Sequence, residues 1–478
     1  MIPSLFNNTV PHSACSAALI PYPDLFGAEF LALQTNFVAN HSQNVPPGYY
    51  SNHGSVNVQN ANFCNVTVTY THPGQNDTIN VQVWLPSDTW NGRLQHIGGS
   101  GWQAGLHQAG LMARMASVGE GYATVGTDGG LGSDVTPVNW GLLSEGNVNL
   151  YLLQNLASTT LNDAAVIAKS VIGSFYKTPP KYSYYTGCSQ GGRQGFQLAQ
   201  RYPDAYDGIA ASAPAINWNQ FVMQGMWGMF VMDQLGEYPP ACEINAITSA
   251  ALKACDGADG IEDGVVADTE SCEFDPATVV GSMVNCTEFG SERKKKLSWL
   301  TCITQWDGAR RADNTTIWFG PSKEAVLTGS ITDVAIVPTT CAANGTCTRG
   351  SFEIADDWLK LFLLKNSSAS TANMTHAEFD DLAHLSVQVY ESMMGTNDPD
   401  LSRFRARGGK LVGYHGTHAL LRLSPMREWV ENGVAPDTLM ASTVGVIPAF
   451  KRPLCPYPKK QFYDGIGNST MGEGFSCV

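Results

Sequence analysis

The chain of 478 residues is long enough for two or three domains, at about 150 residues per domain. Its 42 acidic residues outnumber its 28 basic ones, and the formal net charge of −14 excludes the basic footprint that nucleic-acid binding requires. The same charge argues against binding to an anionic membrane surface. Aromatic residues make up 10% of the chain and charged residues only 15%, which excludes intrinsic disorder. No apolar run reaches the ~18 residues of a membrane span.

Predicted strands and helices alternate along the first half of the chain. Residues 78–84 alternate apolar and polar side chains, which is typical of a half-buried strand. Further strands are predicted at 94–97, 122–125, 182–185 and 207–211, and helices over 161–172 and 191–201. Such alternation indicates an α/β fold with a mostly parallel sheet.

The character of the sequence changes after residue 216. The stretch 217–400 holds seven of the twelve cysteines, and we interpret it as an inserted second domain. A buried strand returns at 410–414. The predicted organisation is therefore a core over 1–216, an inserted domain over 217–400, and the rest of the core over 401–478.

The cysteines indicate an oxidising compartment. None of the twelve forms a Cys-x-x-Cys pair, which argues against a zinc knuckle, and an even number spread along the chain suggests disulfides. Glycosylation acceptors agree with this, since Asn-x-Ser/Thr occurs at ten positions: Asn7, Asn40, Asn65, Asn76, Asn285, Asn314, Asn344, Asn366, Asn373 and Asn468. Residues 1–20 lack the basic and apolar regions of a signal peptide, yet we expect a secreted glycoprotein.

A nucleophile is predicted at Ser189. The segment Gly187-Cys-Ser-Gln-Gly191 lies between a predicted strand and a predicted helix, which is the setting of a nucleophile elbow. Glycine on either side lets the chain turn sharply and lifts the hydroxyl above the sheet. The alternative is a glycine turn with a solvent-facing serine.

An oxyanion hole beside this serine needs two backbone N–H groups. One is predicted at Gln190, the residue after the nucleophile. The other is predicted in the glycine loop over 98–101, because glycine lets backbone approach a substrate closely. A phosphate-binding loop is the competing interpretation, but no G-K-[ST] or G-x-G-x-x-G sequence follows.

An acidic loop over 255–265 is a candidate metal site. Three aspartates lie within eight residues and repel one another unless a cation lies among them, and hard oxygen ligands favour Ca²⁺. The candidate ligands are the carboxylates of Asp256, Asp259 and Asp263 and the carbonyls of Ile261 and Val265. The loop lacks the bidentate Glu of an EF-hand, and a solvated acidic turn is the alternative.

The segments 184–195 and 201–209, which read YYTGCSQGGRQG and RYPDAYDGI, resemble the tannase and feruloyl esterase family, which includes a bacterial mono(2-hydroxyethyl) terephthalate hydrolase. Matching pieces over 98–101, 256–265, 429–433 and 452–458 extend the resemblance over nearly the whole chain. It implies an α/β-hydrolase core with an inserted lid domain, and hydrolysis of aromatic (phenolic) acid esters through an acyl-enzyme on Ser189.

The resemblance also implies roles for single residues. Gly101 and Gln190 supply the oxyanion N–H groups, and the five residues of the acidic loop match the family's calcium ligands. The implied cofactor is a structural Ca²⁺ in the lid domain. The implied partner is a small-molecule or plant cell-wall phenolic ester, with no nucleic acid and no membrane.

The base is where the chain departs from the family. The family's catalytic aspartate lies in a His-Gly-x-x-Asp segment, and its catalytic histidine precedes a cysteine. Here the segment reads His415-Gly-Thr-His-Ala419, and no His-Cys dipeptide exists. The last helix–strand unit of the core is therefore missing relative to the family. His418 is the candidate substitute base. The alternative is an impaired pseudoenzyme, or the product of a splicing or gene-prediction error, that binds esters without turnover.

The missing segment also affects the predicted disulfide pairs. Family-like spacing implies Cys15–Cys64, Cys255–Cys272 and Cys455–Cys477, and we add Cys341–Cys347 as a small loop and Cys242–Cys286 as a nested pair. In the family, the cysteine before the nucleophile is bridged to the one after the catalytic histidine. Because that partner is missing, we predict free thiols at Cys188 and Cys302.

Overall fold

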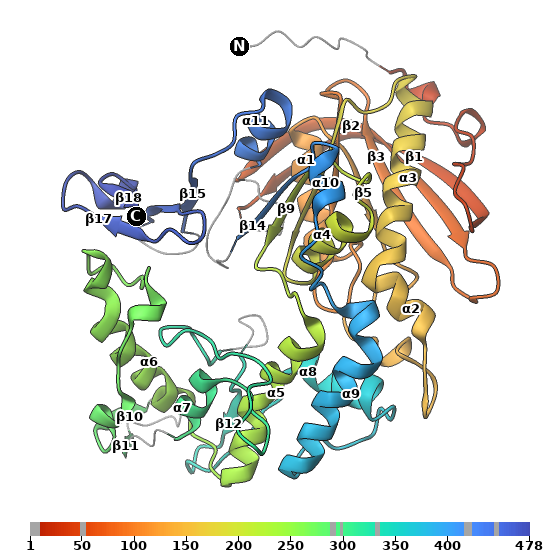
Figure 1. Cartoon of the computed structure of the whole chain (residues 1–478). Helices are drawn as coiled ribbons and strands as arrows, with labels where there is room; N and C mark the ends of the chain where they lie inside the picture. The colour runs from red at the N-terminus through yellow and green to blue at the C-terminus, as the bar shows by residue number, and fades with distance from the viewer. Residues whose placement is uncertain are drawn as a thin grey trace. The chain divides into compact units, whose positions relative to one another are not determined.

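The computed structural model describes residues 10–47, 54–286, 293–296, 300–329, 335–414, 423–443 and 449–478; over 293–296 and 300–303 it describes the backbone alone. Contacts divide the chain into two compact units (Figure 1). Unit 1 comprises 1–143, 149–216 and 393–451, and unit 2 comprises 144–148, 217–392 and 452–478. The sequence predicted that the tail from residue 452 belongs to the core. In the structure this tail groups with unit 2, because it contacts the acidic loop.

Unit 1 is built on an eight-stranded sheet in the order β1-β2-β3-β5-β4-β8-β9-β14. The strands are β1 (Glu29–Val45), β2 (Val56–Thr71), β3 (Ile79–Pro86), β4 (Arg93–Ile97), β5 (Ala123–Thr127), β8 (Tyr182–Cys188), β9 (Gly208–Ser212) and β14 (Lys410–Tyr414). From β5 to β14 all neighbours are parallel, as predicted. The strands β1, β2 and β3 add an antiparallel end to the sheet, so the sheet is mixed and the α/β class is confirmed.

Helices cover both faces of this sheet. They are α1 (Gln108–Gly119), α2 (Leu150–Gln154), the π-helical segment η4 (Asn155–Thr159), α3 (Thr160–Tyr176), α4 (Gln190–Arg201), α10 (Ser402–Ala406) and α11 (Ser424–Asn432). Successive strand residues point to opposite faces. Cys64 accordingly packs in the core cluster that contains α3, and Phe63 in the cluster that contains α1. The cluster on the α3 side also contains Tyr185 of β8 and Leu198 and Ala199 of α4, so it packs these two elements against each other.

Unit 2 is mostly helical. Its helices are α5 (Trp218–Leu235), α6 (Ala241–Cys255), α7 (Leu300–Asp307), α8 (Glu353–Asp357), the π-helical η9 (Trp358–Leu363) and α9 (His376–Met394), whose last two residues belong to unit 1. The hairpins are β10–β11 (Met283–Cys286, Arg293–Lys296), β12–β13 (Thr339–Cys341, Cys347–Arg349) and β17–β18 (Gln461–Tyr463, Phe475–Cys477). The strands β6 (Leu142–Ser144), β7 (Asn147–Val148) and β16 (Lys451–Leu454) lie at or beside the points where the chain passes between units, and β15 (Leu439–Ser442) belongs to unit 1. No described helix is long and apolar enough to cross a membrane.

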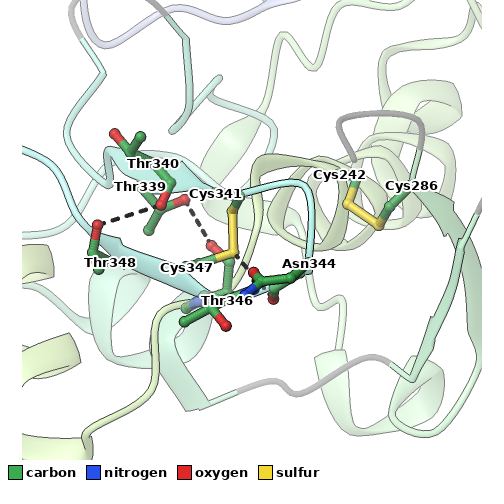
Figure 2. The surroundings of a disulfide bond; sticks show 11 residues. Cys242, Cys286, Thr339, Thr340, Cys341, Asn344, Thr346, Cys347 and Thr348 are labelled. Atoms are coloured by element: carbon green, nitrogen blue, oxygen red, sulfur yellow. Dashed lines mark hydrogen bonds between the residues drawn. A yellow bond between two sulfur atoms is a disulfide. The ribbon is translucent and has the colours of Figure 1, made fainter. Parts of the chain in front are cut away.

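Five disulfides join the cysteine pairs that were predicted: Cys15–Cys64, Cys242–Cys286, Cys255–Cys272, Cys341–Cys347 and Cys455–Cys477. Figure 2 shows two of them in unit 2, where Cys341–Cys347 closes the β12–β13 hairpin. Cys188 is a free thiol. The side chain of Cys302 lies outside the described residues.

Candidate active site

Ser189 occupies a sharp turn between β8 and α4. Strand β8 ends at Cys188, α4 begins at Gln190, and Ser189 between them has φ 58° and ψ −118°. A positive φ is uncommon for a residue with a Cβ and costs energy. The serine is partly exposed while the next residue along the chain is buried. This conformation presents the side chain at the carboxyl end of the sheet, as a nucleophile elbow requires.

Glycines around the turn are required by close backbone approach. A Cβ on Gly187 would lie 2.5 Å from the carbonyl oxygen of Gly191, and one on Gly192 would lie 2.5 Å from that of Ser212. A Cβ on Gly191 would lie 2.7 Å from the carbonyl oxygen of Gly99. Real Cβ atoms do not come this close, so the three glycines let α4 start directly against the glycine loop and β9.

Backbone hydrogen bonds fix the serine on both sides. The Ser189 N–H donates to the carbonyl of Ser212 at 3.1 Å, and the Ser189 carbonyl accepts from the N–H groups of Arg193 at 3.0 Å and Ala215 at 3.1 Å. The Ser212 hydroxyl donates to the carbonyl of Gly187 at 3.1 Å. The elbow is therefore held by the end of β9 as well as by its own helix.

The predicted oxyanion loop is fastened to α4 by side chains that the sequence did not single out. The Gly99 N–H donates to Gln194 Oε1 at 2.8 Å, and Gln194 Nε2 donates to the carbonyl of Ala104 at 3.2 Å. The Tyr185 hydroxyl donates to the carbonyl of Gly191 at 2.8 Å. The α4 side chains Gln190, Arg193, Gln194 and Gln197 are polar yet buried, which the sequence does not reveal. Gly101 has φ 54°, a value that favours glycine.

The free thiol of Cys188 lies directly before Ser189 in the chain. Burial raises the pKa of this thiol, and hydrogen bonds with Ser212 and Ser189 partly oppose the rise. The hydroxyl of Tyr414, at the end of β14, shares the same Ser212 partner, and burial raises the pKa of its hydroxyl. Burial thus keeps the thiol protonated at neutral pH, and a protonated thiol is a poor nucleophile.

The predicted base, His418, lies outside the described residues, as does His415. Within the described part of the chain the sheet ends at β14, which pairs with β9 on one side only. In the family pattern a further helix–strand unit would bring the histidine to this edge.

The acidic loop of unit 2 is folded around its carboxylates and stapled by Cys255–Cys272. Asp256 accepts the backbone N–H groups of Asp263, Gly264 and Val265 at 2.9–3.2 Å. Asp263 forms an ion pair with Arg452. Among the described residues no three acidic, His or Cys side chains converge closely enough to hold a metal ion.

One carboxylate oxygen of the loop lacks a partner among the described residues, whereas the other oxygen of the same residue, Asp259 Oδ1, accepts from the Ile261 N–H at 3.3 Å. Asp259 is 3% exposed, and its Oδ2 is buried with no hydrogen-bond partner in the described structure. Burial, together with the charges of Asp263 and Asp256, raises the pKa of this carboxyl. Asp259 is therefore the part of the loop that fits a hard cation, whereas Asp256 and Asp263 already have partners.

A serine at a strand–helix elbow over a largely parallel sheet defines the α/β-hydrolase class. Residues 64–421 match the family described as "Tannase and feruloyl esterase", and the chain belongs to this family. It is 34% identical over 471 residues to a probable feruloyl esterase of Arthroderma benhamiae, covering 87% of this chain and 86% of that protein. It is 27% identical to a tannase of Aspergillus oryzae, over 77% of this chain and 68% of that protein.

A solved structure shares the fold. The tannin acyl hydrolase of Aspergillus niger aligns with a TM-score of 0.84, covering 100% of this chain and 96% of that chain at 24% sequence identity. The α/β-hydrolase fold predicted from the motifs is thereby confirmed.

Proposed function

We propose that this chain is a serine carboxylic ester hydrolase that acts on esters of aromatic, phenolic acids. The observation that carries the proposal is the strained Ser189 at the β8–α4 elbow, in a chain whose relatives are named feruloyl esterase and tannase. No comparison favours a catalytically dead binding protein.

In the proposed mechanism the Ser189 hydroxyl oxygen attacks the ester carbonyl. The negative charge on the former carbonyl oxygen is stabilised by the N–H groups of Gln190 and Gly101. The bond to the alcohol breaks, and the alcohol leaves with a proton. Water then attacks the acyl-enzyme, releasing the aromatic acid and restoring the serine. His418 remains the predicted group that transfers these protons.

The test compares the purified chain with Ser189→Ala on methyl ferulate and methyl gallate. We expect acid release by the parent chain and a loss of about 10³-fold or more in the variant. Equal rates for the two proteins would overturn the proposal. Binding of both esters with no release above the uncatalysed rate would establish the pseudoenzyme alternative instead.

Calcium, secretion and glycosylation belong to the same proposal. We propose that Asp259, with the other carboxylates of its loop and the carbonyls of Ile261 and Val265, holds a structural Ca²⁺ that ties the loop together. The buried, unpartnered Oδ2 of Asp259 supports this assignment. Five disulfides support an oxidising, extracellular location, where the predicted acceptor asparagines would carry glycans.

A further inference from the structure

A buried arginine lies one turn into the helix that begins after the nucleophile. Arg193 of α4 is 0% exposed, and it has no carboxylate within ion-pairing distance among the residues that the structure describes. Burying a charge without an opposite charge is expensive unless hydrogen bonds compensate. The hydrogen bonds of the guanidinium must therefore offset the cost of burying its charge.

Its hydrogen bonds link two separate elements. Arg193 Nε donates to Oε1 of Gln190 at 2.9 Å. Arg193 Nη2 donates to the carbonyls of Ala157 at 2.8 Å and Leu156 at 3.3 Å. Both carbonyls belong to the π-helical segment η4, inserted between α2 and α3. A π-helical turn departs from the regular i→i−4 ladder and often lies at functional sites, and here two of its carbonyls accept from Arg193.

We propose that Arg193 is a positioning residue for the oxyanion pocket, acting by tying Gln190 to the π-helical segment 155–159. This proposal rests on the proposed function, in which the Gln190 N–H stabilises the oxyanion. Gln190 is the first residue of α4, where backbone is held by few helical hydrogen bonds. The hydrogen bonds of Arg193 to the Gln190 side chain and to the carbonyls of Leu156 and Ala157 restrain the first turn of α4 against η4, and this limits movement of the Gln190 backbone.

The charge of the guanidinium persists in this site. Burial lowers the pKa of Arg193 to about 10, which leaves it protonated at neutral pH. A methionine has a similar volume but no donors, and a lysine keeps the charge with only one donor atom. Arg193→Met therefore removes the hydrogen bonds while keeping the volume, and Arg193→Lys removes most of the hydrogen bonds while keeping the charge.

A second buried arginine provides a matched control. Arg114 of α1 is also 0% exposed, and burial lowers its pKa to about 9. Its guanidinium lies over the ring of Trp84 and donates to Gln82, and neither of these partners belongs to the elbow. Arg114→Met therefore removes a comparable buried guanidinium from the same unit without touching the oxyanion pocket.

The experiment measures kcat, KM and melting temperature for Arg193→Met, Arg193→Lys and Arg114→Met with methyl ferulate, below all melting transitions. For Arg193→Met we expect kcat to fall about 100-fold, the scale of a lost oxyanion donor, with KM changed by less than about threefold. The kcat of Arg193→Lys should be about tenfold higher than that of Arg193→Met. Arg114→Met should lower the melting temperature with kcat within about twofold. A folded Arg193→Met that retains kcat equal to that of Arg114→Met overturns the proposal.

Amide hydrogen exchange decides the question even if the parent chain hydrolyses nothing, in which case the proposed function fails separately. Arg193→Met should accelerate exchange in peptides covering both 150–160 and 185–198, and Arg114→Met should accelerate exchange in neither. Unchanged exchange in both peptides of Arg193→Met would show that Arg193 does not hold Gln190 and the π-helical segment together.

Discussion

At the scale of single residues, the strained backbone of Ser189 depends on its glycine neighbours. The elbow keeps a serine at φ 58° because β9 and α4 supply hydrogen bonds on both sides, and because Gly187, Gly191 and Gly192 allow these elements to touch. Strain of this kind persists only where the surroundings over-determine it.

Gly191→Ala should damage the elbow, because its Cβ would lie 2.7 Å from the Gly99 carbonyl oxygen. We expect a lower melting temperature and a kcat reduced about tenfold or more, as the oxyanion loop is displaced. Gly173→Ala in α3 is the matched control, since no atom lies within 4 Å of its added Cβ. The control should be more stable by about 0.5–1 kcal/mol. Equal kcat in the two variants would contradict this account.

A buried histidine couples the stability of unit 1 to pH. His72 contacts Asp77 Oδ2 through Nδ1 at 2.7 Å and Asp163 Oδ2 through Nε2 at 3.2 Å. The hydrogen bond to Asp163 raises the pKa of His72, and the bond to Asp77 adds to the rise while burial opposes it. The folded state therefore binds the imidazole proton more tightly than the unfolded state does.

The stabilising effect of this proton is complete below the unfolded pKa of about 6.5 and is lost as the pH rises through the higher folded pKa. The free energy of unfolding of the parent chain should therefore exceed that of His72→Gln most at pH 5–6, and the gap should narrow toward pH 9. Denaturant unfolding across this range measures it. A gap that widens with rising pH would refute the assignment.

Residues at the site differ in how far sequence could predict them. Ser189 follows from its local sequence pattern, three of the cysteine pairs follow from the family resemblance, and the other two were added as a small loop and a nested pair. The roles of Gln194 and Arg193 do not, because their hydrogen bonds reach the glycine loop and the π-helical segment, which are distant along the chain. Tyr185 was predicted as part of a strand, but its hydrogen bond to the carbonyl of Gly191 was not predicted.

At the scale of elements, the acidic loop behaves as a folded turn with one unsatisfied carboxylate. Adding Ca²⁺ to EDTA-treated protein should raise the melting temperature, because a ligand present at 100 times its Kd adds about 2.7 kcal/mol to stability. Asp259→Asn should abolish the shift, and Mg²⁺ should produce a smaller one because it dehydrates reluctantly. Identical melting curves in Ca²⁺ and EDTA would leave the loop as a solvated turn.

The strands show which patterns predict an element. The strands β8, β9 and β14 were predicted because each contains a short apolar or aromatic run with a glycine beside it. The alternation Val66-Thr-Val-Thr-Tyr70 in β2 was a signal that went unused, since Val66, Val68 and Tyr70 are all buried. Strand β1 gives no such signal, because it is a long, polar edge strand whose pairing with β2 contains register shifts.

At the scale of the whole molecule, the chain shares the fold of its family, and the predicted difference from the family lies after β14. The chain has the family's fold and carries Ser189 at the strand–helix elbow, and its sheet ends at β14 in the described residues. Cys188, whose family partner would follow the catalytic histidine, is free. That the segment with the catalytic histidine is missing stays a prediction, made from the absence of a His-Cys dipeptide. The sequence could not predict that the tail from 452 groups with unit 2, which depends on contacts such as Arg452–Asp263.

The central claim is that Ser189 is a working nucleophile. Reaction with diethyl p-nitrophenyl phosphate, followed by intact-mass measurement and peptide mapping, tests it most directly, because attack by the serine oxygen releases p-nitrophenolate and leaves a stable phosphoryl ester. We predict one diethylphosphoryl group per chain, located on Ser189 within the peptide 182–201, and none on Ser189→Ala. Hydrolysis of methyl ferulate by a chain that carries no label on Ser189, or a label on another residue, would contradict the account.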